Sequence, residues 1–423
     1  MAESRTAKLR RLWLNVHLWL GVGLALLLIP VSISGGLLVY HDEVDALLNP
    51  KRYAVTGTEV TQPASVYLAR AAEAVTGEPG GFVTTGLRYP EEPGAPVRVM
   101  ARPQQRSDGP PRFYTVFLDP PTAQVLDVMD FRASFVGFMH VFHGNLMLAQ
   151  YSGRQIVGWV GVAMLLLSLT GIWLWWPRNG RFLIGLRWTR SPRFTFNLHN
   201  MLGFWISIPL AVVSLTGIYL SFPQTARSMM SSIATMSPPG GRPGLGDVVA
   251  NTNLTPERAL EIAQQSVPNA TPVAVFLPTA AGGRGPQAGA AQPQQRAAEP
   301  AERPQGAAAP QGERPRQEGG RGPAPSWRIQ LARSETETVT VMVDDRSGSA
   351  TMAPERQSGD RAASWIRWIH EGSHTGQVWK FIVLLTGVFP PIFAVTGVIM
   401  WLRRRSNRRA LEAKRGVQLS PAE

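Results

Sequence analysis

Seven histidines and no cysteine limit the chemistry open to this chain of 423 residues. His17 and His199 each begin a long apolar stretch, and a glycine follows each of them four residues later, on nearly the same helix face. A second glycine, Gly35 or Gly217, lies eighteen residues beyond each histidine. Histidine is rare in membrane helices and is a candidate functional residue there. The matched positions therefore predict one site that takes a histidine from each stretch.

Further histidines precede the other two apolar stretches. His140 and His143 are three residues apart, and His370 and His374 are four apart, so each set shares a helix face. We match His143 with His370 because they occupy corresponding points in the two halves of the chain. His140 and His374 remain alternatives. We interpret His41, at the end of the first apolar stretch, as structural or as a gate to this second site.

Four apolar runs, near residues 12–40, 156–176, 202–222 and 378–402, are each long enough to cross a bilayer, which takes about 20 residues. The net charge of +13 comes largely from arginine clusters before the first run, between the second and third, and after the fourth. A chain that crosses four times has all three clusters on one side, as the positive-inside rule requires. This placement predicts two cytoplasmic termini and argues against a nucleic-acid partner.

The first apolar run is long, and no A-x-A cleavage site follows it, which favours a retained anchor over a cleaved signal peptide. The same topology places His17 and His199 at the cytoplasmic face. It places His143 and His370 at the outer face.

Two neutral imidazoles from facing helices can ligate the iron of one haem from both sides. We therefore expect His17 with His199, and His143 with His370, to hold two haem b groups. A zinc or copper site needs three or four neighbouring ligands, and only the outer histidines, with His140 and His374 included, could supply them. The absence of cysteine excludes disulfides, thiol catalysis, cysteine-ligated iron–sulfur clusters and c-type haem.

Small residues recur along the apolar stretches and predict close helix packing. They also leave room for a flat cofactor beside the backbone. The steps are Gly35-Gly36, Thr170-Gly171, Thr216-Gly217 and Thr396-Gly397.

Each polar segment between spans predicts a helix followed by strands and a hairpin with an aspartate-led turn. Thr255 is the expected N-cap of the second such helix, with Pro256 at its first position. Residues 280–325 have no apolar period and predict a disordered insertion. The fold class is therefore membrane α-helical, with four transmembrane helices and two small α+β periplasmic modules built as an internal duplication. Such repeats place the site between the halves.

The predicted segments alternate between membrane, periplasm and cytoplasm. In order they are a cytoplasmic N-terminus (1–11), span one (12–40), module one (41–132), a periplasmic approach with span two (133–176), a basic cytoplasmic loop (177–198), span three (199–222), module two (223–360), an approach with span four (361–402) and a basic cytoplasmic tail (403–423).

Several stretches resemble the PepSY-associated transmembrane family, and the polar modules resemble PepSY domains. This family includes iron-regulated membrane proteins and bacterial inner-membrane ferrisiderophore reductases. The resemblance covers the chain except for the insertion. The stretches are HLWLGVGLALLLIPVSISGGLLVYHDEVDALLNP, HGNLMLAQYSGRQIVGWVGVAMLLLSLTGIWLWWPR, LHNMLGFW, IHEGSH and TGVIMWLRRR.

The resemblance implies a four-helix haem b protein of the bacterial inner membrane, with His17, His143, His199 and His370 at the recurrent histidine positions. It implies electron transfer through the lipid bilayer to a periplasmic ferric siderophore or other Fe(III) chelate, with release of Fe(II). Some members carry a fused flavoprotein domain. Only a short basic tail follows the last span here, so we expect a separate donor: a flavin reductase, reduced flavin or a quinol. The alternatives are a non-enzymatic PepSY regulatory or accessory protein and a periplasmic-face metal-handling protein.

Overall fold

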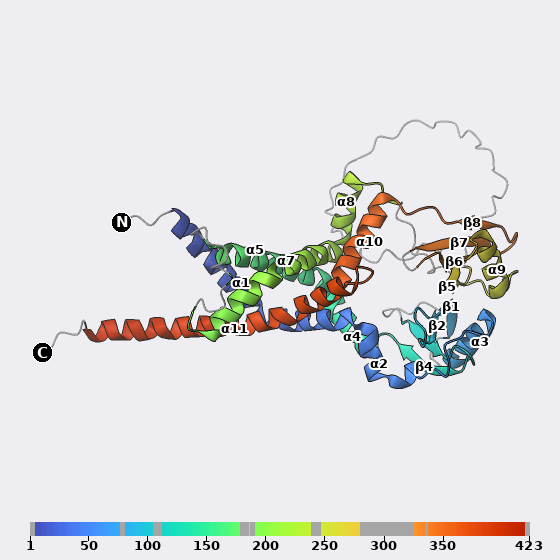
Figure 1. Ribbon diagram of the computed structural model, residues 1–423, viewed down its shortest axis with the longest axis horizontal. Coiled ribbons are helices and arrows are strands. Elements are labelled where there is room, and N and C mark those ends of the chain that lie inside the picture. Colours follow the sequence, from blue (N-terminus) through green and yellow to red (C-terminus); the bar gives the residue numbers. More distant parts are fainter. Residues whose placement is uncertain are drawn as a thin grey trace, which may run out of the picture. The chain divides into compact units, whose positions relative to one another are not determined.

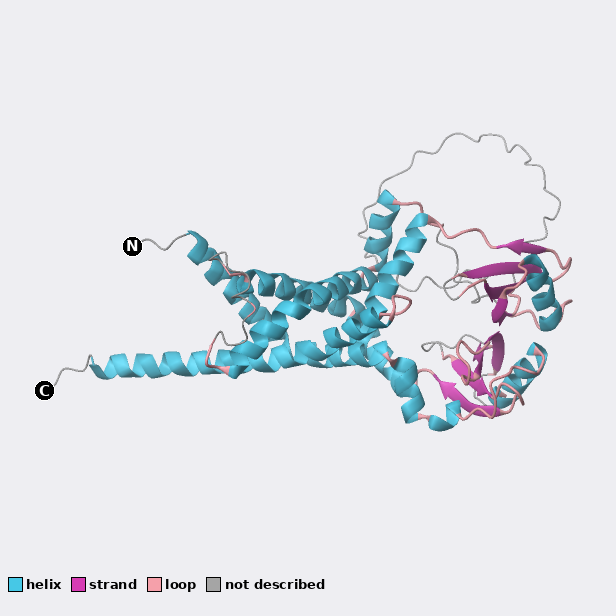
Figure 2. Ribbon diagram, viewed as in Figure 1, coloured by secondary structure: helices cyan, strands magenta, loops and turns pink. Residues whose placement is uncertain are grey.

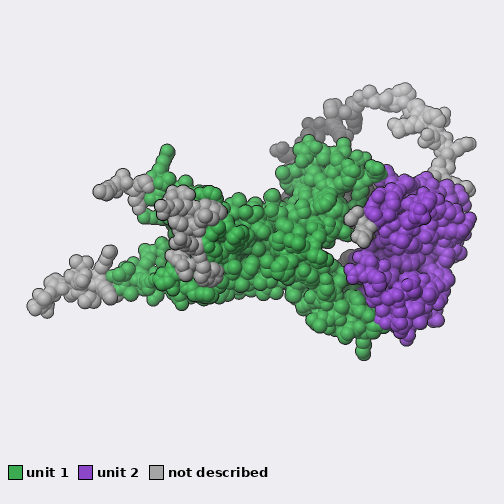
Figure 3. All heavy atoms as spheres, in the orientation of Figure 1, with its two compact units in different colours: residues 1–54, 129–238, 355–423 green, residues 55–128, 239–354 purple. Residues whose placement is uncertain are grey.

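The computed structural model describes residues 5–76, 81–104, 112–177, 186, 191–237, 247–279, 325–334 and 337–418. The predicted insertion lies outside these residues, apart from its last position, and so does most of the predicted basic loop. The chain divides into two compact units (Figure 3), which are described separately: residues 1–54, 129–238 and 355–423, and residues 55–128 and 239–354. The first unit is helical, and the strands belong almost entirely to the second (Figure 2).

Four helices of the first unit are long and apolar enough to cross a membrane, as the sequence predicts. They are α1 (Arg5–Val39), α5 (Gly153–Trp175), α7 (Phe194–Ser221) and α11 (Gln377–Gln418). The chain is therefore a multi-pass membrane protein. Shorter helices adjoin these spans: α2 (His41–Leu48), η1 (Pro50–Tyr53), α4 (Phe135–Asn145), η2 (Ala149–Tyr151), α8 (Pro223–Ile233) and α10 (Ser358–Glu371).

In the helical unit, α1 packs along α11 and α5 packs along α7 (Figure 1). The helices α1 and α11 approach closely at Gly36 and Gly387, where a Cβ atom added to Gly387 would lie 2.5 Å from Cα of Gly36. Lipid is as apolar as leucine, so membrane helices associate through close packing of small residues. This crossing fixes the part of α1 that also carries Gly35.

The second unit repeats one order of elements: a helix and then four strands. The eight strands form one sheet in the order β4-β3-β2-β1-β5-β6-β7-β8, because β1 and β5 pair antiparallel. The sequence predicts the strands of two separate modules but not this junction. The first set is α3 (Ala64–Val75), β1 (Phe82–Arg88), β2 (Val97–Pro103), β3 (Tyr114–Leu118) and β4 (Val125–Asp130). The second is α9 (Pro256–Ser266), β5 (Thr271–Phe276), β6 (Ser326–Ala332), β7 (Thr338–Asp344) and β8 (Ala350–Met352).

Alternation along the strands places apolar side chains on one face of the sheet, against α3 and α9. Tyr67 of α3 and Val99 of β2 are fully buried in one half of this core. Ile329 of β6 and Ala263 of α9 are fully buried in the other half. Thr255 caps α9 as predicted, since its side chain accepts a hydrogen bond from the Arg258 N–H. The expected helix-and-strand content is therefore present in each half.

A buried aspartate at the hairpin turn ties each half together. Asp119 accepts hydrogen bonds from the backbone N–H and the hydroxyl of Thr56, at 2.7 and 2.6 Å. Asp345 accepts bonds from the backbone N–H groups of Asn253 and Leu254, at 2.9 and 3.2 Å, and from the Trp327 indole at 2.8 Å. Burial alone would raise the pKa of Asp345, but these bonds outweigh it and lower the pKa below its ordinary value. Its stabilisation is therefore complete at neutral pH and is lost on acidification through the lowered pKa.

Replacing Asp345 with alanine leaves the Trp327 indole and two backbone N–H groups without their acceptor. We expect a local loss of about 3 kcal/mol, or roughly a hundredfold faster amide exchange in β6. Hydrogen–deuterium exchange of the full chain in detergent measures this rate. The control is Asp344→Ala, because among the described residues the Asp344 side chain bonds only Arg346 and Ser347 of its own turn. Equal exchange in both variants would contradict the anchoring role of Asp345.

Candidate functional site

His17 of α1 and His199 of α7 face each other, with ring centroids 6.3 Å apart and ring planes at 80°. The Nδ1 atom of each ring lies 2.9 Å from a threonine hydroxyl: Thr170 of α5 for His17, and Thr396 of α11 for His199. Each hydroxyl donates its own proton to a carbonyl oxygen of its helix, 2.6 or 2.8 Å away. The hydroxyl oxygen therefore accepts from Nδ1–H, which leaves the Nε2 lone pair of both rings available.

His143 of α4 and His370 of α10 form a second pair, with ring centroids 6.2 Å apart and planes at 39°. Each Nδ1 lies 3.0 Å from a backbone carbonyl oxygen, that of Val31 in α1 or of Val213 in α7. A carbonyl oxygen can only accept, so Nδ1 is again the donor. The same tautomer results as in the first pair.

The rings of the second pair press against glycines. A Cβ atom added at Gly35 would lie 2.7 Å from Cε1 of His143, and one added at Gly217 would lie 2.9 Å from Cε1 of His370. Real Cβ atoms essentially never approach a neighbour this closely. Glycine is therefore required at both positions if the rings are to lie where they do.

The first pair also lies beside glycines, but less tightly. An added Cβ would be 3.5 Å from His17 at Gly171 and 3.7 Å from His199 at Gly397, which is ordinary van der Waals contact. All four rings thus lie against a glycine that directly follows a serine or threonine.

Both pairs have the spacing of two ligands on opposite sides of one metal ion. A metal–imidazole bond is about 2 Å long, and the nitrogen lies about 1 Å from the ring centre, which gives a centroid separation of roughly 6 Å. In the described part of the chain, no hydrogen bond involves Nε2 of any of the four rings. Ligating histidines characteristically donate their other N–H to a fixed acceptor, as all four do here.

The remaining histidines lie apart from these pairs. His140 stacks edge-on against Phe131, and His374 contacts Trp368. His41 is exposed and hydrogen-bonds the carbonyl of Leu38. Within the described ranges, no three His, Asp or Glu side chains lie close enough to hold a metal ion. The three-ligand or four-ligand zinc or copper site considered from the sequence is therefore not formed by these residues.

The helix that carries His143, α4, is positioned by its N-cap and by a close turn of the backbone at its first residues. Ser134 caps α4, since its hydroxyl accepts from the Gly137 N–H at 3.0 Å and donates to the Phe131 carbonyl at 2.8 Å. A Cβ atom at Gly137 would lie 1.6 Å from that carbonyl oxygen. Only glycine allows the chain to turn this closely into α4.

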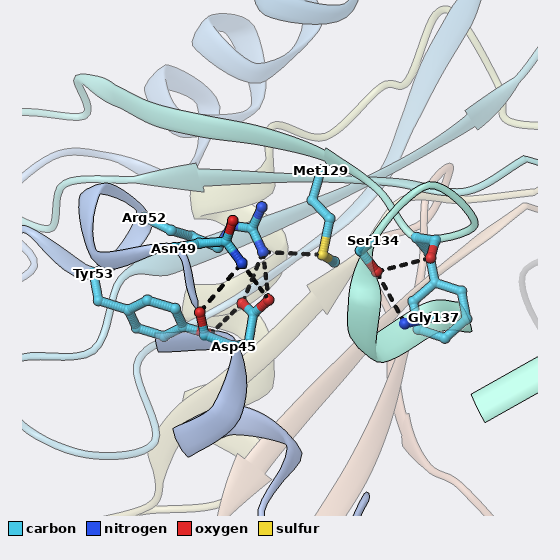
Figure 4. A network of polar contacts seen from close by, with 8 residues as sticks. Asp45, Asn49, Arg52, Tyr53, Met129, Ser134 and Gly137 are labelled. Atoms are coloured by element: carbon cyan, nitrogen blue, oxygen red, sulfur yellow. Dashed lines mark hydrogen bonds and ion pairs between the residues drawn. The ribbon is translucent and has the colours of Figure 1, made fainter. Parts of the chain in front are cut away.

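A buried ion pair connects the end of α1 to the approach to α4 (Figure 4). Asp45 of α2 accepts two bonds from Arg52, at 2.6 and 2.8 Å, and further bonds from Tyr53 and Asn49. The same Arg52 nitrogen contacts the sulfur of Met129 at 3.3 Å. A buried pair is costly to break, because one charge is then left without a partner. The cluster holds α2 against the segment that enters α4.

Comparison with known families gives one finding. The profile described as the PepSY-associated TM region matches residues 14–404, and therefore all four spans and both sets of strands. A search of curated proteins found no match.

Replacing Gly137 with alanine should shift or unfold the start of α4, because its methyl group has no space. We expect a loss of about 3 kcal/mol. Gly144→Ala, on the same helix, is the control, since nothing lies within 4 Å of its added Cβ. Thermal unfolding of the detergent-solubilised protein, followed by circular dichroism, compares the two. A Gly137→Ala protein as stable as Gly144→Ala would disprove the packing argument.

Proposed function

This chain belongs to the family of PepSY-associated transmembrane proteins, and we propose that it carries electrons through bound haem b to a ferric chelate outside the bacterial inner membrane. The observation that supports the proposal best is the pair of imidazole sites with metal-ligand spacing, 6.3 and 6.2 Å between centroids. Each site takes one histidine from the first half of the chain and one from the second.

The two donor sets fit haem better than a bare metal ion. Each pair offers two imidazoles and no third protein ligand among the described residues, so the other coordination positions must come from the bound group. His17 and His199 would hold one haem, and His143 and His370 the other. Haem b supplies a one-electron Fe(III)/Fe(II) couple when bound. The chain itself fixes the imidazole tautomers, buries the site among apolar helices and leaves room beside the glycines.

The two sites are separated along the spans. His17 and Gly35 lie on α1, and His199 and Gly217 lie on α7, with eighteen residues between the members of each set. At a rise of 1.5 Å per residue, this separation is about 27 Å. Since His143 packs on Gly35 and His370 on Gly217, one site lies near each end of the crossing. Two sites at these depths divide the membrane into shorter electron-transfer steps.

The arginines that border the spans indicate the direction of electron transfer across the membrane. Arg403, Arg404 and Arg405 follow the apolar part of α11, and the same end of the bundle carries His17 and His199. By the positive-inside rule, this end is cytoplasmic and the strands are periplasmic. In this proposal, the two periplasmic sets of one helix and four strands are two copies of one duplicated unit. Electrons then enter near His17 and His199, from a flavin reductase, reduced flavin or a quinol.

The acceptor is proposed to be a ferric siderophore or another Fe(III) chelate. Hard oxygen ligands hold Fe(III) more strongly than Fe(II), so reduction weakens the chelate and releases the metal. No acid–base group is needed for this step. The acceptor gains one electron, which haem held by the two histidine pairs would supply.

Replacing His199 with alanine should remove one haem and leave the other. The test is haem per chain and the dithionite-reduced optical spectrum of purified protein, expected to show low-spin b-type haem at about two per chain in the wild type. The control is His374→Ala, because the His374 ring contacts Trp368 and lies outside both pairs. Unchanged haem content in His199→Ala, or wild-type protein without haem after expression with ample haem supply, would overturn the proposal.

The glycines predict an asymmetry between the two sites. Gly35→Ala and Gly217→Ala place a methyl group within 2.9 Å of an outer ring and should disturb that site alone. The matched inner substitutions, Gly171→Ala and Gly397→Ala, leave ordinary contact distances and should keep both haems. Electron paramagnetic resonance resolves the two low-spin ferric signals. Loss of an inner signal in Gly171→Ala, with both signals intact in Gly35→Ala, would contradict the placement of the sites.

A further inference from the structure

The face of the sheet opposite α3 and α9 carries a group of arginines at the junction of the two halves. Arg98 alternates with Val97 and Val99, which are buried in the helix-covered core, so it lies on the other face. Arg88 of β1 pairs directly with Arg98 of β2. Arg328 of β6 extends the group across β5.

Phe276 lies between these arginines. Its partner on β6 is Arg328, whose guanidinium carbon is 4.0 Å from the Phe276 ring centroid, and the guanidinium of Arg88 is 6.0 Å from the same centroid. On the β1 side the partner is Gly86, and an added Cβ there would lie 2.7 Å from the phenyl ring. The ring therefore occupies the space that a side chain at Gly86 would fill. Cations over an aromatic face are attracted to it, most strongly when they are partly desolvated.

Arg88 and Arg328 have no negative charge beside them on their own or the adjoining strands. The strands β3, β2, β1, β5 and β6 contain no aspartate or glutamate. Arg88 and Arg328 form no ion pair with any residue in the described ranges, and Nε of Arg328 is buried without a hydrogen-bond partner there. Burial lowers the pKa of Arg328, and the charge of Arg88 lowers it further.

We propose that Arg88 and Arg328, with Phe276 between them, bind the acceptor, and that the acceptor is an anionic, oxygen-rich ferric chelate. Guanidinium groups bind carboxylate-type oxygens through two parallel hydrogen bonds, and the phenyl ring holds the two guanidinium groups beside each other. A bound anion would relieve the repulsion between the arginines. The inference rests on the proposed function and names its substrate class.

The test separates binding from electron transfer by using gallium(III) citrate, which matches ferric citrate in charge but is not reduced under these conditions. Isothermal titration with the full chain in detergent should show binding to the wild type. Arg328→Gln and Arg88→Gln should each weaken binding at least tenfold. Arg70→Gln is the control, because Arg70 is exposed on α3, on the opposite face, and pairs with Glu73. Arg328→Lys keeps the charge but loses the planar fork, so we expect intermediate affinity.

Each outcome decides between the two proposals. Equal affinity in all variants, or equally tight binding of a neutral gallium(III) trihydroxamate, would overturn this site whatever the haem content. Selective, arginine-dependent binding by a protein that contains no haem would support the site and overturn electron transfer. Variants that lose binding should keep the wild-type thermal midpoint, since neither Arg88 nor Arg328 holds an ion pair in the part of the chain that the structure describes. A lowered midpoint together with lost binding would assign these arginines a structural role and count against the site.

Discussion

The arrangement of the helical unit depends on one requirement: an imidazole inside a membrane bundle needs a partner for each of its two nitrogens. Water is absent there, and an unpaired polar atom in hydrocarbon costs several kcal/mol. Nδ1 is satisfied within the protein, by Thr170 and Thr396 in one pair and by the carbonyls of Val31 and Val213 in the other. No hydrogen bond involves Nε2 of these rings among the described residues, which leaves its lone pair available for the group that the proposed function assigns to each site.

This requirement explains why small residues stand beside the rings. A carbonyl or hydroxyl in a helix is reached from outside only where no bulky side chain covers it, so a glycine next to a serine or threonine exposes the acceptor. Gly35 and Gly36 both make room for a neighbour: Gly35 for the ring of His143, and Gly36 for the backbone of Gly387. Packing between α1 and α11 and the position of an imidazole are therefore coupled at a single turn of helix.

Much of this unit could be predicted from the sequence, because apolar length and histidine spacing are local properties. The spacing from His17 to Gly35 recurs from His199 to Gly217, and the structure brings together His17 with His199 and His143 with His370. Their role as ligands stays a prediction. The Nδ1 acceptors were not predicted, although Thr170 and Thr396, which accept from His17 and His199, belong to the repeated Thr-Gly steps. The pairing of β1 with β5 also could not be predicted. Which strand edges pair depends on contacts between residues distant in sequence, and here on the space beside Gly86 that the Phe276 ring fills, which no local sequence pattern indicates.

The hydrogen bonds to the four histidines all stay within one half of the chain. His17 bonds to α5 and His143 to α1, whereas His199 bonds to α11 and His370 to α7. Each half thus orients its own two imidazoles. In the proposed role, a group ligated from both sides would add a further link between halves that already pack together, α1 along α11 and α5 along α7. The first group to bind would restrain the remaining motion of the halves and so lower the entropic cost of filling the second site. Cofactor loading would then be cooperative even though the sites are a membrane thickness apart.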